Sequence, residues 1–376
     1  MRVCYFGTYR FNYSRNVIMI EGLRRNGVEV IECHESLWSG IEDRVAAASG
    51  RWLSPMFLVR VLRVYTRLIW RYLRLPAHDL VVVGYPGQFD VFLARFLARL
   101  RGVPLVWDIF MSIYLIAVER NLDRRSRFTV GLLRRIERLA CRLPDRLILD
   151  TADYVAWFES MHGVSKDRFR LVPTGADDRA HAPAPLGISS DGPTRVLYYG
   201  TFIRNHGVLS IIEAARLLRD DAAICFEMVG EGPERAAAVE LVGRYGLTNI
   251  VFSPWLEKEQ LQERIAQADI CLGVFGDTPQ SLMTVQNKIY EGLAAGKPVL
   301  TGDAPAVRRA FQHGTHLYLV ERGNPAALAE AVRFLAANLA LRQRLATFGH
   351  AEFAANYTIA HIGERFAAHL RELVRV

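Results

Sequence analysis

Lys288 and Glu291 are the charged side chains whose positions most directly predict chemistry. Residue periodicity predicts a helix from Gln286 to Ala295, shortly after a buried strand at Ile270–Val274. A lysine in the first turns of a helix opposes the macrodipole, whereas a bound anion is favoured there by the dipole and by free N–H groups. We therefore predict a phosphate site at Lys288 and Asn287, with Glu291 accepting hydrogen bonds from sugar hydroxyls. The alternative is a solvated lysine–glutamate pair.

Two further turns with glycine follow predicted strands in the same half of the chain. The first, GTFIRNHG, covers residues 200–207 and leads into a helix, and the second, GEGP, covers residues 230–233. Arginine and backbone amides at helix N-termini suit a diphosphate. Because the carboxyl ends of parallel strands meet at one edge of a sheet, we expect Arg204 and His206 to lie near Lys288.

The first half of the chain offers two weaker candidates at strand ends. Gly7 ends the first predicted strand, where its lack of a side chain lets the backbone approach a ligand or merely serves the turn. Asp108 follows the predicted strand Pro104–Trp107, where it either caps a helix over Ile109–Val118 or faces a ligand.

Apolar strands and helices alternate along both halves, which predicts an α/β protein with two doubly wound parallel sheets. The segment HAPAPLGISSDGP, rich in proline, glycine and serine, is typical of a linker. We predict a domain over 1–180, a linker over 181–193, a second domain over 194–357 and a helix over 358–376 that crosses back to the first domain.

The composition is that of a globular protein with real cores. The 376 residues are 51% hydrophobic and 23% charged, and the five cysteines are scattered without metal or redox spacing. The opening MRVCYFGTYR is too short and too polar for a signal peptide, and no apolar run approaches the about 18 residues of a membrane span. These features predict a cytoplasmic protein with reduced thiols.

The excess of positive charge lies in the first half. Residues 1–180 hold 28 Lys and Arg against 19 Asp and Glu, net +9, whereas residues 181–376 hold 19 against 20, net −1. An anionic partner is therefore expected at the first domain.

A predicted helix over residues 57–75 contributes most of this excess positive charge. Its arginines fall within about an 80° arc of the helix, and nearly everything else on it is apolar or aromatic. This pattern is typical of a helix lying in a membrane interface, and a second basic segment spans residues 124–146. The alternative is a solvated stripe over a helix packed in the domain. The predicted membrane-contacting residues are Arg60, Arg63, Arg67, Trp70, Arg71 and Arg74. Nucleic acid ranks below lipid, because no helix-turn-helix, zinc-ligand or RNP-like signature is present.

At these motifs the chain resembles the retaining glycosyltransferases of family 4, which have the GT-B fold. The resemblance covers almost the whole chain, through VPTGAD (172–177), YYGTFIRNHG (198–207), MVGEGPE (228–234), ADICLGVFGDT (268–278) and QNKIYEGLAAGKPVLTGD (286–303). It implies that Glu291 is the second glutamate of the E-x7-E motif, which holds the donor ribose. It also implies that Gly200 lets its loop approach the diphosphate.

The chain departs from the common family pattern at three positions. Thr201 and His206 stand where the family usually has arginine and lysine, and Met283 replaces the first glutamate of E-x7-E. We therefore expect Lys288 and Arg204 to neutralise the phosphates. The full predicted donor-binding set is Gly200, Thr201, Asn205, His206, Gly207, Gly230, Asp277, Met283, Thr284, Asn287 and Glu291, in which Asp277 stands in for the lost glutamate.

In the first half the resemblance is looser. It implies that Gly7, Thr8 and Tyr9 face the acceptor and that Asp108 lies near the reacting carbon.

Together these features predict transfer of a sugar, with retention, from a UDP- or GDP-linked donor to a hydroxyl. No cofactor and no metal are expected. The basic half favours a lipid-linked acceptor at the cytoplasmic face of the inner membrane, as in surface polysaccharide synthesis. A GT-B nucleotide-sugar epimerase and a non-enzymatic membrane-associated scaffold are the rival functions.

Overall fold

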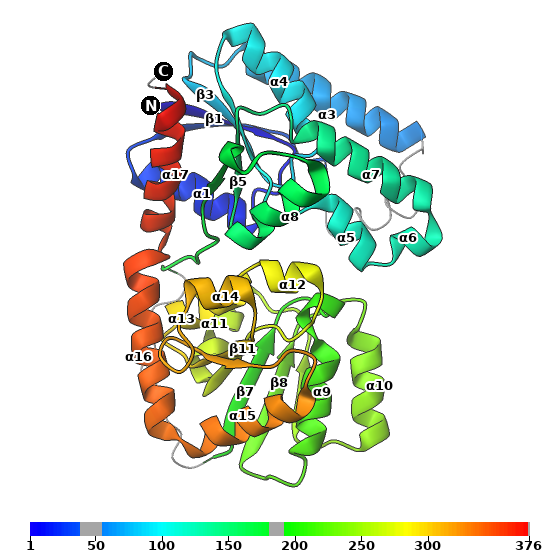
Figure 1. Ribbon diagram of the computed structural model, residues 1–376, viewed down its shortest axis with the longest axis vertical. Helices are drawn as coiled ribbons and strands as arrows, with labels where there is room; N and C mark the ends of the chain where they lie inside the picture. The colour runs from blue at the N-terminus through cyan, green and yellow to red at the C-terminus, as the bar shows by residue number, and fades with distance from the viewer. Residues whose placement is uncertain (38–54, 180–191, 375–376) are drawn as a thin grey trace. The chain divides into compact units, whose positions relative to one another are not determined.

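Short buried strands alternate with helices to build two parallel six-stranded sheets, one in each of two compact units (Figure 1). The computed structural model describes residues 1–37, 55–179 and 192–374. Unit 1 comprises Met1–Pro173 and the C-terminal segment from Ile359, and unit 2 comprises Thr174–Thr358. This architecture confirms the predicted α/β class. The predicted linker lies outside the described residues except for its last two positions.

In unit 1 the strands lie in the order β2-β1-β3-β4-β5-β6. Strands β3 and β4 are buried along their whole length because helices cover both faces of the sheet. The strands are β1 Arg2–Gly7, β2 Glu29–His34, β3 Leu80–Val83, β4 Leu105–Asp108, β5 Arg146–Leu149 and β6 Phe169–Leu171. The helices are α1 Ser14–Arg25, α3 Pro55–Leu73, α4 Asp90–Arg101, α5 Ile113–Glu119, α6 Leu122–Arg125, α7 Arg127–Ala140, α8 Ala152–His162, η2 Lys166–Arg168 and α17 Ile359–Val374.

In unit 2 the strands lie in the order β12-β11-β10-β7-β8-β9, with β7 between β10 and β8. They are β7 Thr194–Tyr199, β8 Ile224–Val229, β9 Ile250–Ser253, β10 Ile270–Leu272, β11 Val299–Gly302 and β12 Tyr318–Val320. The helices are η3 Arg204–His206, α9 Val208–Leu217, α10 Arg235–Tyr245, α11 Lys258–Gln267, α12 Pro279–Met283, α13 Asn287–Ala294, α14 Pro305–Ala310, α15 Pro325–Ala337 and α16 Leu339–Asn356.

The C-terminal helix α17 packs against α1 within unit 1 (Figure 1). Two glycines make this close approach possible, because a Cβ atom added to Gly363 would lie 2.0 Å from the Gly22 carbonyl oxygen. The Asn26 side chain reinforces the contact by donating to the Ala360 carbonyl at 2.9 Å.

We expect Gly363→Ala to destabilise unit 1 by about 2–3 kcal/mol, because the new methyl group must push the two helices apart. Gly131→Ala in α7 is the matched control, since nothing lies within 4 Å of a Cβ added there. That change should be neutral or stabilise by up to about 1 kcal/mol. Urea unfolding of both variants measures the difference, and equal midpoints would contradict the close packing of α1 and α17.

Candidate functional site

Two glycine loops meet at the carboxyl edge of the unit 2 sheet. Gly200 follows β7 and Gly230 follows β8, and both have φ of +133°, which strongly favours glycine. A Cβ atom on Gly230 would lie 2.0 Å from the Gly200 carbonyl oxygen, so the loops touch backbone to backbone. A Cβ atom on Gly200 would lie 3.0 Å from Lys288 Nζ. Gly200 therefore leaves the space in which the lysine ammonium lies.

The Lys288 ammonium is buried without a counterion. The residue is the second of α13, and only 6% of its surface is exposed. Its Nζ lies 3.3 Å from His206 Nδ1 and 4.2 Å from the centre of the Tyr198 ring. Among the ion pairs of the described residues, none includes Lys288. Burial lowers its pKa from 10.5 to about 7, with Glu291 acting in the opposite direction.

His206 is held by a carbonyl and a tyrosine hydroxyl. Its Nδ1 lies 2.7 Å from the Thr201 carbonyl oxygen and 2.8 Å from the Tyr198 hydroxyl. Because a carbonyl can only accept, Nδ1 carries the proton in this arrangement. Burial first, and then Lys288, hold the His206 pKa well below its usual value. The neutral ring keeps its lone pair on Nε2, so it can donate to a phosphate only after Nε2 is protonated.

Glu291 lies one turn further along α13 and is half-buried. The Tyr199 hydroxyl donates to the Lys288 carbonyl at 3.1 Å and lies within hydrogen-bonding reach of the Glu291 carboxylate. Burial raises the pKa of Glu291, while Lys288 and Tyr199 counteract this rise.

The segment before α13 is tied to the loop after β7. Ser281 of α12 donates to the Asn205 carbonyl at 2.6 Å, and Asn205 Nδ2 donates to Gln280 at 3.3 Å. Gln286 Nε2 in turn donates to the Thr284 hydroxyl at 3.0 Å, which itself donates to the Gln280 carbonyl at 2.8 Å. These contacts fix the start of α13, where no side chain caps the first turn. The Ile289 N–H already donates to the Gln286 carbonyl at 3.0 Å, so the N–H groups of Asn287 and Lys288 are the ones that can face a ligand.

The other predicted donor-binding residues lie around this cluster. Arg204 and Asp277 are exposed and line a separate hollow of about 290 Å³, together with Gly207 and Glu234. Lys288 does not line that hollow. Met283 and Asn287 are half-buried on either side of Thr284. The structure thus brings Gly200, Thr201, His206, Lys288 and Glu291 together, and places Arg204 and Asp277 apart from them.

Sequence reasoning missed Tyr198 and Tyr199, which contact His206 and Lys288. Both end an apolar strand, where tyrosines are ordinarily core residues, so no local signal distinguishes them.

The lowered pKa of Lys288 predicts a pH-dependent stability. The unfolded chain binds this proton up to pH 10.5, whereas the folded chain holds it only below about pH 7. The unfolded state therefore binds more protons between these values, so the free energy of unfolding rises with pH across this window. We expect the stability difference between wild type and Lys288→Met, measured in urea, to shrink from pH 7 to pH 9. A difference independent of pH would contradict this.

In unit 1 the structure favours a structural role for Asp108. The residue is fully buried, and its two oxygens accept from Arg15 Nε and Nη2, each at 2.9 Å. Arg15 Nη1 also donates to the carbonyls of Val172 and Pro173, where the chain leaves unit 1. Asp108 does not cap a helix, because the next helix begins at Ile113. Sequence reasoning did not single out Arg15.

The predicted acceptor loop is also engaged within unit 1. The Thr8 backbone N–H donates to Asp90 at 2.7 Å, and the Tyr9 hydroxyl donates to Glu32 at 3.0 Å. Both side chains are buried, and Gly7 has φ of +134°. The backbone of this loop is engaged as well, since the Gly7 carbonyl accepts from the Glu35 N–H at 3.4 Å.

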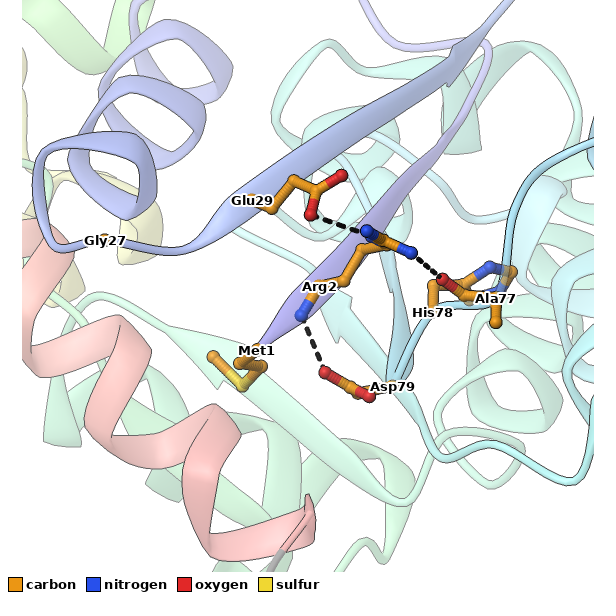
Figure 2. A pocket seen from close by; sticks show the side chains of 7 residues that line it. All are labelled: Met1, Arg2, Gly27, Glu29, Ala77, His78 and Asp79. Atoms are coloured by element: carbon orange, nitrogen blue, oxygen red, sulfur yellow. Dashed lines mark hydrogen bonds and ion pairs between the residues drawn. The ribbon is translucent and has the colours of Figure 1, made fainter.

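A second hollow, of about 440 Å³, lies at the amino ends of β1 and β2 (Figure 2). Its charged groups pair with one another, since Arg2 bonds Glu29 at 2.8 Å and the Ala77 carbonyl at 2.9 Å. The Arg2 backbone N–H donates to Asp79 at 2.6 Å. Ligands of parallel sheets bind at the opposite edge, so this hollow is not our candidate site.

No group of three or more histidine, cysteine, aspartate or glutamate side chains in the described part of the chain is arranged to hold a metal ion. No helix there is both long and apolar enough to cross a membrane.

Two family models match the chain and together cover most of it. "Glycosyl transferase 4-like domain" matches residues 18–175, and "Glycosyl transferases group 1" matches residues 193–338. The second model contains the Lys288 cluster.

Curated relatives are glycosyltransferases of several kinds. A D-inositol 3-phosphate glycosyltransferase of Nocardia farcinica is 29% identical over 58% of this chain, and the match spans about half of that relative. The alpha-D-kanosaminyltransferase of Streptomyces kanamyceticus is 27% identical over 74% of this chain and 72% of the relative. LpsD of Rhizobium meliloti, a lipopolysaccharide core biosynthesis glycosyltransferase, is 24% identical over 70% and 77%.

Solved structures share the fold over the whole chain. Sucrose-phosphate synthase of Thermosynechococcus elongatus superposes with a TM-score of 0.73 at 16% identity, covering 100% of this chain and 99% of the other. Anabaena HepE, solved with UDP and glucose, superposes with a TM-score of 0.70 at 14% identity, covering 99% and 100%. At these identities the likeness concerns the fold.

Proposed function

Because the chain belongs to the GT-B glycosyltransferases of the family 4 type, we propose that it moves a sugar from a nucleotide-sugar donor to a hydroxyl acceptor with retention. The single observation that carries the donor site is the buried Lys288 ammonium, which has no carboxylate within ion-pair distance among the described residues. A buried cation without a counterion is costly, and a diphosphate supplies the missing negative charge.

The groups around Lys288 fit a departing nucleoside diphosphate. The uncapped first turn of α13 offers backbone N–H groups, and Gly200 brings its loop close to the Lys288 ammonium. We assign Glu291 to the donor ribose, as the E-x7-E resemblance implies, whereas Arg204, which lines the separate hollow, is given no phosphate contact.

In the proposed reaction the bond between the sugar C1 and the phosphate oxygen breaks, and a bond from the acceptor oxygen to C1 forms on the same face. The acceptor proton passes to the departing phosphate. The Lys288 ammonium and the helix N–H groups stabilise the charge that develops there, as preorganised dipoles do. Because the departing phosphate takes the acceptor proton, this mechanism needs no general base from unit 2.

For the acceptor we propose a lipid-linked hydroxyl at the cytoplasmic face of the inner membrane. The arginine row of α3 supports this location, since Arg60, Arg63, Arg67, Arg71 and Arg74 are all exposed. The role of one relative, LpsD, in lipopolysaccharide core synthesis is compatible with it. The Gly7–Tyr9 loop is our candidate for the acceptor side.

Calorimetry with UDP and with GDP tests the donor site, and turnover of the matching nucleotide sugar tests the reaction. We expect one diphosphate to bind wild type and to bind Lys288→Ala at least about 100-fold more weakly, the scale of a lost charged contact. Isomerisation of the donor without an acceptor would instead indicate an epimerase. No binding of either nucleotide would indicate a scaffold.

A further inference from the structure

Two adjacent helices of unit 1 expose an unusual number of large apolar side chains. In α3 they alternate with arginines, and in α4 they form a row of aromatic and leucine side chains spaced by four. The exposed apolar residues are Leu58, Val59, Leu62, Ile69, Trp70 and Leu73 on α3, and Phe92, Phe96 and Leu100 on α4, with Phe89 just before it. Soluble monomers rarely expose apolar side chains in one contiguous group of this size.

The buried side chains of α3, among its described residues, form one narrow row. Val64, Leu68 and Tyr72, spaced by four, are its buried residues. At 100° per residue, the apolar row of Leu62, Ile69 and Leu73 lies on one side of this buried row, and the arginine row lies on the other.

The apolar row of α3 faces toward α4. The Tyr65 hydroxyl donates to Asp90 at the start of α4 at 2.7 Å, and Arg101 at its end donates to the Tyr72 and Leu73 carbonyls at 3.0 and 3.1 Å. Contacts at both ends of α4 place the helices side by side (Figure 1). The exposed rows of the two helices are therefore parts of one surface, which we call the α3–α4 face.

The charges of the α3–α4 face select its partner. The two helices contain one acidic residue, Asp90, which is buried and bonded to Thr8 and Tyr65. The arginine row remains exposed beside the apolar rows, although Arg67 and Arg71 contact Glu35. A second copy of the chain would cover the apolar side chains but would bring arginines and no exposed carboxylates.

We propose that the α3–α4 face lies in the boundary between headgroups and acyl chains of an anionic bilayer, with Phe92 and Phe96 inserted beside Leu62 and Leu73. The arginine row then contacts lipid phosphates. This inference deepens the proposed acceptor location, because it makes α4, which was not among the predicted membrane-contacting residues, a membrane element. It does not depend on the donor chemistry.

Vesicle cosedimentation of the full chain, without donor or acceptor, tests the α3–α4 face. Wild type should bind vesicles of mixed phosphatidylglycerol and phosphatidylcholine, and bind phosphatidylcholine alone far less. Phe92→Ser combined with Phe96→Ser should weaken binding to the anionic vesicles by about 10-fold or more, because two aromatic side chains leave the interface. Phe334→Ser in α15 of unit 2, a phenylalanine that is 49% exposed, is the matched control and should bind like wild type.

Three results would overturn the proposal. The double variant could bind as tightly as wild type at an unchanged melting temperature, which would exclude α4. Wild type could fail to bind anionic vesicles at low salt. Light scattering could show a dimer that the double variant loses, which would make the face an interface between copies. Because donor binding by calorimetry is measured separately, each of these results leaves the proposed transferase chemistry standing.

Discussion

Lys288→Met is expected to abolish glycosyl transfer and, at the same time, to raise the melting temperature of the protein without ligand. Methionine keeps the apolar stem but removes a buried ammonium that has no counterion. Loss of a preorganised charge at the leaving group should lower kcat by about 10²–10³-fold or more. Removing the desolvated charge should add about 1–3 kcal/mol of stability at pH 7, or about 2–4 °C per kcal/mol for a unit of this size.

Lys297→Met is the matched control for this prediction. Lys297 is also buried in unit 2, and burial also lowers its pKa, but its ammonium donates to the Ala266 carbonyl at 2.5 Å. We expect this variant to keep its activity and to lose stability, because a buried carbonyl loses its partner. If Lys288 lies in a ligand site, Lys288→Met should gain stability and Lys297→Met should lose it. If Lys288→Met instead destabilises the protein and retains full kcat, the donor site must lie elsewhere.

Breaking the ion pair between Arg15 and Asp108 is expected to have the largest effect on stability. Both side chains are fully buried, and Arg15 also holds the Val172 and Pro173 carbonyls. Either Arg15→Met or Asp108→Leu leaves an uncompensated buried charge, so each should cost about 3–5 kcal/mol of the free energy of unfolding. Combining the two should cost much less than their sum, because no charge is then left unpaired. Urea unfolding of the four proteins gives this coupling.

The same double variant separates a structural role of Asp108 from a catalytic one. If Asp108 only pairs with Arg15, the folded double variant keeps substantial turnover. If Asp108 reaches the reacting carbon, as the family resemblance implies, the double variant folds but is inactive. The bidentate geometry and complete burial of the pair favour the first outcome.

The sequence alone determined the two-sheet α/β architecture and was enough to single out Lys288 as a candidate binding residue. Alternating apolar strands and amphipathic helices are local patterns, so two parallel sheets follow from periodicity and from the packing of their faces. Lys288 stood out because a lysine in the first turn of a helix opposes the helix dipole. This signal is local too, since it depends only on residues close to Lys288 in the sequence. The arginine row of α3 is periodic in the same way.

Only the tertiary structure decided which of these groups have partners. Asp108 stands at a strand end, and only the fold shows that α1, remote in sequence, brings Arg15 to it. Lys288 could have paired with Glu291, yet its ammonium lies by His206 and Tyr198 of another loop and strand. The packing of α4 leaves Phe92 and Phe96 exposed, which no pattern in the sequence indicated. Pairing and burial depend on residues distant in the chain, and local periodicity carries no information about them.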